Sequence, residues 1–108
     1  MTVNQLAKSI NCRVLSMPDG EREISGAYIG DLLSWVMGRA SEGNAWITIM
    51  SNINTVAVAT LADVSCIILA EGVSLDDEVL SVAREKGVNV LTTEMSAYDT
   101  AISLNGII

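Results

Sequence analysis

Four short apolar segments, each separated from the next by a helix-like segment, constrain the fold of this chain more than any other feature. The apolar segments run over 25–29, 46–50, 65–70 and 88–91, and β-branched residues, which favour strands, are frequent in them. The segment 65–70 shows no polar alternation, as expected of a strand buried on both faces of a sheet. Strands that alternate with helices predict an α/β fold with a mostly parallel sheet flanked by helices.

Capping residues and turn residues locate the intervening helices. Helices are predicted at 2–10, at 31–39, from Asn52 or Asn54 to about 61, from Ser74 to Gly87, and from Ser96 to about 104. Ser74 with Asp77 and Ser96 with Asp99 have the spacing of a helix-capping pair. A short strand at 12–16 precedes the Pro18-Asp19-Gly20 turn. A length of 108 residues predicts one domain over 1–108.

The charge balance excludes several classes of function. Six Lys and Arg stand against thirteen Asp and Glu, a net charge of −7. This balance argues against binding to nucleic acid and to anionic membranes. The chain has no His, which excludes Ser-His-Asp and Cys-His catalysis and His-ligated zinc.

The two cysteines, Cys12 and Cys66, lie in apolar surroundings without a CxxC motif. We expect two buried thiols in a reducing cytoplasm, with a disulfide or a reactive thiol as the alternative. The stretch 43–62 is uncharged over 20 residues and long enough to span a membrane. Asn52 and Asn54 would lie near the middle of such a span at high cost, so we predict a strand, a turn and a helix instead.

No motif in the sequence supports catalysis. The loop 38–43 has the length of a phosphate loop, but Asn44-Ala45 stands where Lys and a hydroxyl residue are required; a helix-ending turn at Gly38 is the simpler interpretation. The acidic run 76–78 fans around a helix start and does not converge on a metal ion. We therefore predict no catalytic residue, no metal site and no cofactor.

Candidate ligand-binding residues follow three predicted strands. They are Gly30, Asp31, Asn52, Asn54 and Gly72. The carboxyl ends of parallel strands share one edge of the sheet, which is the usual ligand site of such folds. The alternative is that the glycines serve turns and the asparagines cap a helix.

Trp35, Met37 and Trp46 are candidate dimer-contact residues. Residues 31–39 are apolar nearly all round, which indicates a helix buried on two sides, and Trp is frequent in interface cores. Core packing of either Trp is the alternative, and the sequence does not decide between them.

The segments 23–38, 44–50, 54–63 and 66–72 together resemble the DRTGG domain family. The resemblance implies a Rossmann-like domain that tends to pair with itself and that occurs beside catalytic domains in phosphotransacetylase, HPr kinase and CBS-domain pyrophosphatases. This chain is similar to the form that occurs alone. The Gly-Asp-Arg of the family falls on Ser51-Asn52-Ile53, and its Thr-Gly-Gly falls on Ala70-Glu71-Gly72. A ligand that requires the Arg or the Thr would lose its contact here.

Three functions fit these observations. The first is a non-enzymatic regulatory or interaction module, a cytoplasmic homodimer with a possible protein partner and no contact with nucleic acid or membrane. The second is a sensor of a small ligand, such as an adenine nucleotide, at the carboxyl edge of the sheet. The third is an enzyme, and it ranks last because no catalytic arrangement is recognisable in the sequence.

Overall fold

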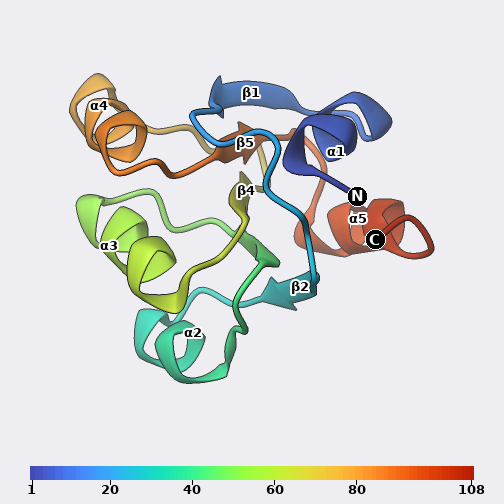
Figure 1. The fold of residues 1–108 in the computed structure, drawn as a ribbon, viewed down its shortest axis with the longest axis horizontal. Helices are drawn as coiled ribbons and strands as arrows, with labels where there is room; N and C mark the ends of the chain where they lie inside the picture. The colour runs from blue at the N-terminus through green and yellow to red at the C-terminus, as the bar shows by residue number, and fades with distance from the viewer.

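The computed structural model describes all 108 residues, which form five strands and five helices (Figure 1). In chain order they are α1 (Val3–Ser9), β1 (Arg13–Ser16), β2 (Gly26–Ile29), α2 (Leu33–Arg39), β3 (Asn44–Thr48), α3 (Ile53–Ala62), β4 (Cys66–Leu69), α4 (Asp77–Glu85), β5 (Val90–Thr92) and α5 (Ala97–Leu104). Every predicted helix and strand is present, and the boundaries differ by a few residues.

The five strands form one sheet in the order β1-β5-β4-β3-β2. The four strands from β2 to β5 are parallel, and β1 pairs antiparallel with β5. The predicted α/β fold with a mostly parallel sheet is confirmed. The antiparallel strand is the one that lies outside the alternating pattern, because it is joined to β2 by a turn region and not by a helix.

The helices cover the two faces of the sheet unequally. In Figure 1, α2, α3 and α4 lie on one side of the sheet, and α1 and α5 lie on the other. Two separate hydrophobic cores result, one on each face. Side chains alternate between them along each central strand, so Ile67 of β4 is in the first core and Ile68 is in the second.

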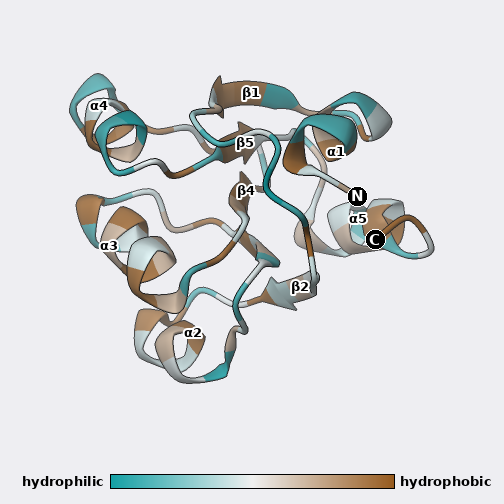
Figure 2. Ribbon diagram, viewed as in Figure 1, coloured by the Kyte–Doolittle hydropathy of each residue, from teal (hydrophilic) through white to brown (hydrophobic).

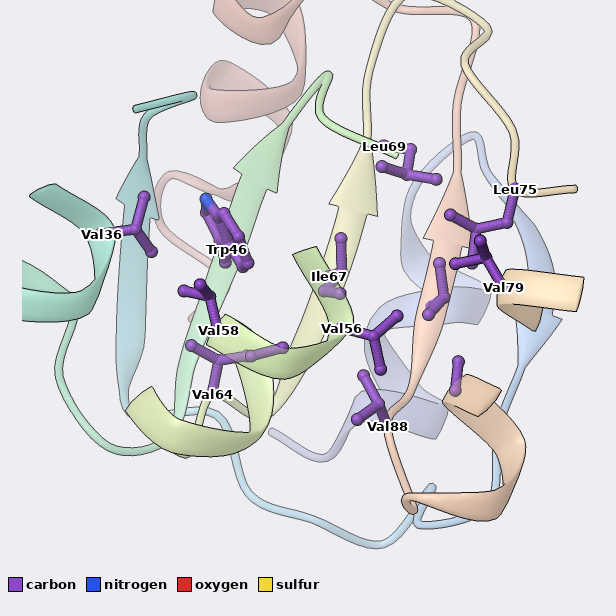
Figure 3. Close-up of a cluster of buried hydrophobic side chains, with 13 residues drawn as sticks. Val36, Trp46, Val56, Val58, Val64, Ile67, Leu69, Leu75, Val79 and Val88 are labelled. Carbon is purple, nitrogen blue, oxygen red and sulfur yellow. The ribbon is translucent and has the colours of Figure 1, made fainter. Parts of the chain in front are cut away.

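Trp46 of β3 is the largest fully buried side chain and lies in the first core. Figure 3 shows its ring beside Val58 of α3 and near Val36 of α2. Its indole Nε1–H donates to the carbonyl oxygen of Gly30 at 2.9 Å, so the one polar atom of the side chain is satisfied. The prediction that Trp46 contributes to a dimer contact is therefore wrong, because no part of this residue reaches the surface.

Two local predictions also need correction. The fourth helix begins after Asp76, whose carboxylate accepts from Val79 N–H at 3.0 Å, and not at Ser74. Leu75 lies between Ser74 and Asp76 and is buried in the first core, and the helix starts only after it. Gly38 lies inside α2 and does not end it; the turn into β3 uses Gly43, at φ +82°.

The uncharged stretch 43–62 forms β3, a turn and α3, as predicted. No helix in the structure has the length and apolar character needed to cross a bilayer.

Replacing Trp46 by Ala should lower the free energy of unfolding by about 3–5 kcal/mol, because it removes a fully buried aromatic side chain and leaves a cavity. Urea denaturation followed by far-UV circular dichroism measures the loss. Tyr98→Ala is the matched control, since the Tyr98 side chain is 74% exposed and its truncation should cost less than about 1 kcal/mol. Equal losses in the two variants would contradict the assignment of Trp46 to the core.

Candidate functional site

The carboxyl edge of the parallel strands contains four of the five predicted ligand-binding residues. Gly30 and Asp31 follow β2, Asn52 follows β3, and Gly72 follows β4. Since β2, β3 and β4 are neighbours, these residues form a row along one edge. Asn54 lies in the first turn of α3 and lines a groove between α2 and α3 instead.

The Asp31 side chain fastens the end of β2 to the end of β3. Its Oδ1 accepts from the Thr48 hydroxyl at 2.8 Å and from the Ile49 N–H at 3.0 Å. The Thr48 hydroxyl in turn accepts from Met50 N–H. These bonds divert Ile49 and Met50 from the ladder, which explains why β3 ends at Thr48 and not at Met50 as predicted. One oxygen of Asp31 thus has a structural role.

Asn52 is the N-cap of α3. The structure therefore shows the helix-capping role that the sequence offered as the alternative to ligand binding. Its side-chain oxygen accepts from the N–H groups of Asn54 at 2.9 Å and Thr55 at 3.2 Å. These are two of the N–H groups that a helix start leaves without a partner.

The two glycines are positions of close approach. Gly72 has φ +72° and donates its N–H to Thr93 O at 2.8 Å. A Cβ at Gly72 would lie 2.6 Å from a carboxylate oxygen of Glu94. A Cβ at Gly30 would lie 3.0 Å from the ring of Tyr28. The Glu94 and Tyr28 side chains thus occupy the space that a side chain would need at Gly72 and Gly30.

A small hollow also lies at the carboxyl edge of the sheet. It is beside β1 and β5, whereas Gly30 follows β2 on the other side of the sheet. Its volume is about 160 Å³. It is lined by Asn11, Cys12, Arg13, Thr92, Thr93 and Glu94. Sequence reasoning missed this hollow because it exists only where the antiparallel β1 meets β5, and that pairing is a tertiary contact between distant segments.

Three other arginines lie away from this edge. Arg22 pairs with Asp63 at 3.0 Å, beyond the end of α3. Arg39, at the end of α2, lies 3.7 Å from the centre of the Trp35 ring, and Arg84 in the last turn of α4 reaches Leu15 O at 3.4 Å. Helices that connect parallel strands end at the amino edge of the sheet, so all three arginines lie far from the predicted site.

Both thiols are free, as expected, and burial raises the pKa of each. Cys66 is completely buried in β4, and burial raises the pKa of its thiol to about 12. Cys12 is half-buried beside the small hollow. A thiol with a raised pKa is a poor nucleophile at neutral pH, so neither cysteine has the character of a reactive site.

An apolar surface is the most extensive feature outside the core. It is carried by α2, α3 and the residues beside them, where six of the twelve exposed large hydrophobic side chains lie: Leu32, Trp35, Met37, Ile49, Ile53 and Leu61. Figure 2 shows α2 and α3 in brown and pale tones, with teal at the end of α2, while α1 and α4 carry more teal. We call this the α2–α3 surface.

Two grooves cross the α2–α3 surface. One, of about 520 Å³, runs between α2 and α3 and is lined by Leu33, Ser34, Met37, Asn54, Ala57, Val58 and Leu61. The other, of about 340 Å³, runs between α3 and α4. Trp35 is 53% exposed and Met37 is 42% exposed, so both predicted contact residues do reach the surface. The sequence indicated Trp35 and Met37 because the helix over 31–39 has no polar face.

Comparisons with known proteins agree with the fold. Residues 5–107 match the family model described as DRTGG domain. No curated protein matches the sequence. A crystal structure of the CBS and DRTGG domains of the regulatory region of Clostridium perfringens pyrophosphatase, complexed with its activator diadenosine tetraphosphate, is similar with a TM-score of 0.75 at 14% identity. The similarity covers 95% of this chain and 45% of that one, so this chain corresponds to less than half of the solved protein.

Replacing Asp31 by Ala should lower the free energy of unfolding by about 1–3 kcal/mol, because Thr48 and Ile49 lose an acceptor at a partly buried site. Asp31→Asn keeps a side-chain oxygen and should retain most of the stability. Urea denaturation of the three proteins tests this. If the Asn and Ala variants were equally destabilised, the negative charge and not the acceptor would be the important property.

Cys66 should not react with a thiol reagent at pH 8 while the chain is folded, because a pKa of about 12 keeps it protonated and burial denies access. In denaturant the chain should show two reactive thiols. Mass spectrometry after labelling counts them, and a Cys12→Ser variant isolates Cys66. Rapid labelling of the folded Cys12→Ser variant would show that β4 opens readily.

Proposed function

The chain belongs to the DRTGG domain family, and from that premise we propose that it is a non-enzymatic regulatory or interaction module that acts as a cytoplasmic homodimer. The α2–α3 surface supports this proposal more than any other observation. A group of large exposed apolar side chains on neighbouring elements is typical of an interaction site. A similar domain occurs within the regulatory region of the Clostridium perfringens pyrophosphatase, which fits a regulatory role.

Charge favours this surface as the place where two copies meet. Between residues 32 and 62 the only charged residues are Arg39 and Glu42, although the chain has thirteen acidic residues in all. Two copies that each carry a net charge of −7 repel one another. They can approach with least repulsion where the acidic residues are absent, and that is where the apolar side chains gather.

The polar groups of the carboxyl edge are engaged in the fold. The Asp31 carboxylate, the Asn52 amide and the backbone of Gly72 form internal hydrogen bonds. This use supports an interaction module over a ligand sensor at the row from Gly30 to Gly72.

A ligand sensor is the second candidate, and the hollow beside Arg13 favours it. Arg13 is an exposed arginine without an ion-pair partner, and the hollow opens at the edge where ligands of such folds bind. At about 160 Å³ the hollow is smaller than the roughly 300–1,000 Å³ typical of small-molecule sites. A small anionic metabolite fits it better than a whole nucleotide does.

Native mass spectrometry over a dilution series should show a dimer at micromolar concentration. Trp35→Glu should shift the protein to monomer, because it replaces a large exposed apolar side chain of this surface by an acidic one. Tyr98→Glu, at an exposed aromatic on α5 away from this surface, is the control and should remain dimeric.

A monomer at every concentration would refute the homodimer. A bound mass that disappears in Arg13→Ala would instead favour the sensor.

A further inference from the structure

The two edges of the sheet differ in how they are protected. The β1 edge carries Arg13 and has an irregular register between Val14 and Ser16. A charged residue and a bulge are the usual means by which an edge strand avoids pairing with another strand. The β2 edge, Gly26–Ile29, pairs in register with β3 and has no charge and no proline. By these criteria β2 is an open edge.

The backbone of β2 presents its hydrogen-bonding groups outward at Ala27 and Ile29. Gly30 N–H donates to Ile47 O of β3 at 3.2 Å, and Ala27 and Ile29 are in register with Ala45 and Ile47. Because the direction of hydrogen bonding alternates along a strand, Tyr28 faces β3 together with Gly30, while Ala27 and Ile29 face away from it.

Apolar groups flank this open edge on the α5 side of the sheet. A hollow of about 300 Å³ lies there, and its apolar lining comes from Ala27, Ile29, Ile47, Ala101, Leu104 and Ile108. The hollow exists because α1 and α5 leave the β2 end of this face uncovered. Figure 1 shows β2 at the end of the sheet below α5.

Apolar groups also flank the edge on the α2 side. Residues of a helix are about 100° apart, so Leu32 and Trp35 lie on the opposite side of α2 from Met37, which lines the groove toward α3. Since α2 is the last helix on its face of the sheet, the side away from α3 projects over the β2 edge.

We propose that two copies of the chain pair antiparallel along the open edge of β2, so that the two five-stranded sheets join into one sheet of ten strands. This inference rests on the proposed homodimer and specifies its geometry. A second copy is the occupant that the edge suits, because one two-fold axis satisfies the outward N–H and C=O groups of both strands at once. The uncharged edge from Ile24 to Gly30 offers a charged partner nothing to recognise.

The spacing of the helices agrees with this arrangement. Strands in a sheet are about 4.8 Å apart, and Val36 of α2 packs in the same core as Tyr28 of β2 and Trp46 of β3. A two-fold axis beside β2 therefore places the two copies of α2 about two strand spacings apart, close to the usual distance of 8–10 Å between packed helices. Leu32 and Trp35 of each copy would then contact the other copy of α2, which explains why these large side chains are exposed in the single chain.

The test compares lysine substitutions at the two edges. Ile29 and Val14 are similarly exposed, at 49% and 47%, so Ile29→Lys and Val14→Lys are a matched pair. Native mass spectrometry of the full chain should show a monomer for Ile29→Lys and a dimer for Val14→Lys. In the unsubstituted chain, hydrogen exchange measured by NMR should show that the amides of Ala27 and Ile29 become protected as the concentration rises.

The outcomes separate this inference from the proposed function. A dimer that survives Ile29→Lys, with unprotected amides at Ala27 and Ile29, would overturn pairing along β2 and leave the homodimer intact. A chain that is monomeric without any substitution would refute both. If Ile29→Lys does not fold, the exchange of the two amides in the unsubstituted chain still decides the question.

Discussion

The burial of β3 and β4 on both faces is the constraint on which the rest of the structure depends. Every side chain of β4 is buried, and alternate residues belong to the two different cores. A strand of this kind is stable only between two layers of helices. The two layers of helices follow from the need to cover both faces of these strands.

The two helical layers are unequal, and this inequality shapes the surface. Three helices lie on one face and two on the other, so the β2 end of the sheet has a helix over one face only. The same end carries the edge strand without charge and the helix with the largest exposed aromatic side chain, Trp35. Ile29 on this edge and Leu32 and Trp35 beside it are exposed apolar side chains at this end of the sheet.

Two polar residues at the carboxyl edge of the sheet contribute hydrogen bonds to the fold. Asp31 and Asn52 are polar residues at strand ends, the position where ligands bind in many parallel sheets. Here the Asp31 oxygen accepts from Ile49 N–H just beyond the end of β3, and the Asn52 oxygen accepts from Asn54 N–H at the start of α3.

The sequence by itself determined the order and type of the elements, because hydrophobic period and capping residues act over a few positions and are visible in one segment. It also indicated that residues 31–39 keep apolar groups on all sides. Only the tertiary structure decided that Trp46 is buried while Trp35 is exposed, since both lie in apolar segments and differ only in what packs over them. The pairing of β1 with β5, the hollow beside Arg13 and the open edge of β2 were equally hidden, because each depends on which distant segments lie side by side. Local chemistry thus fixed the elements, and packing between them fixed the surface.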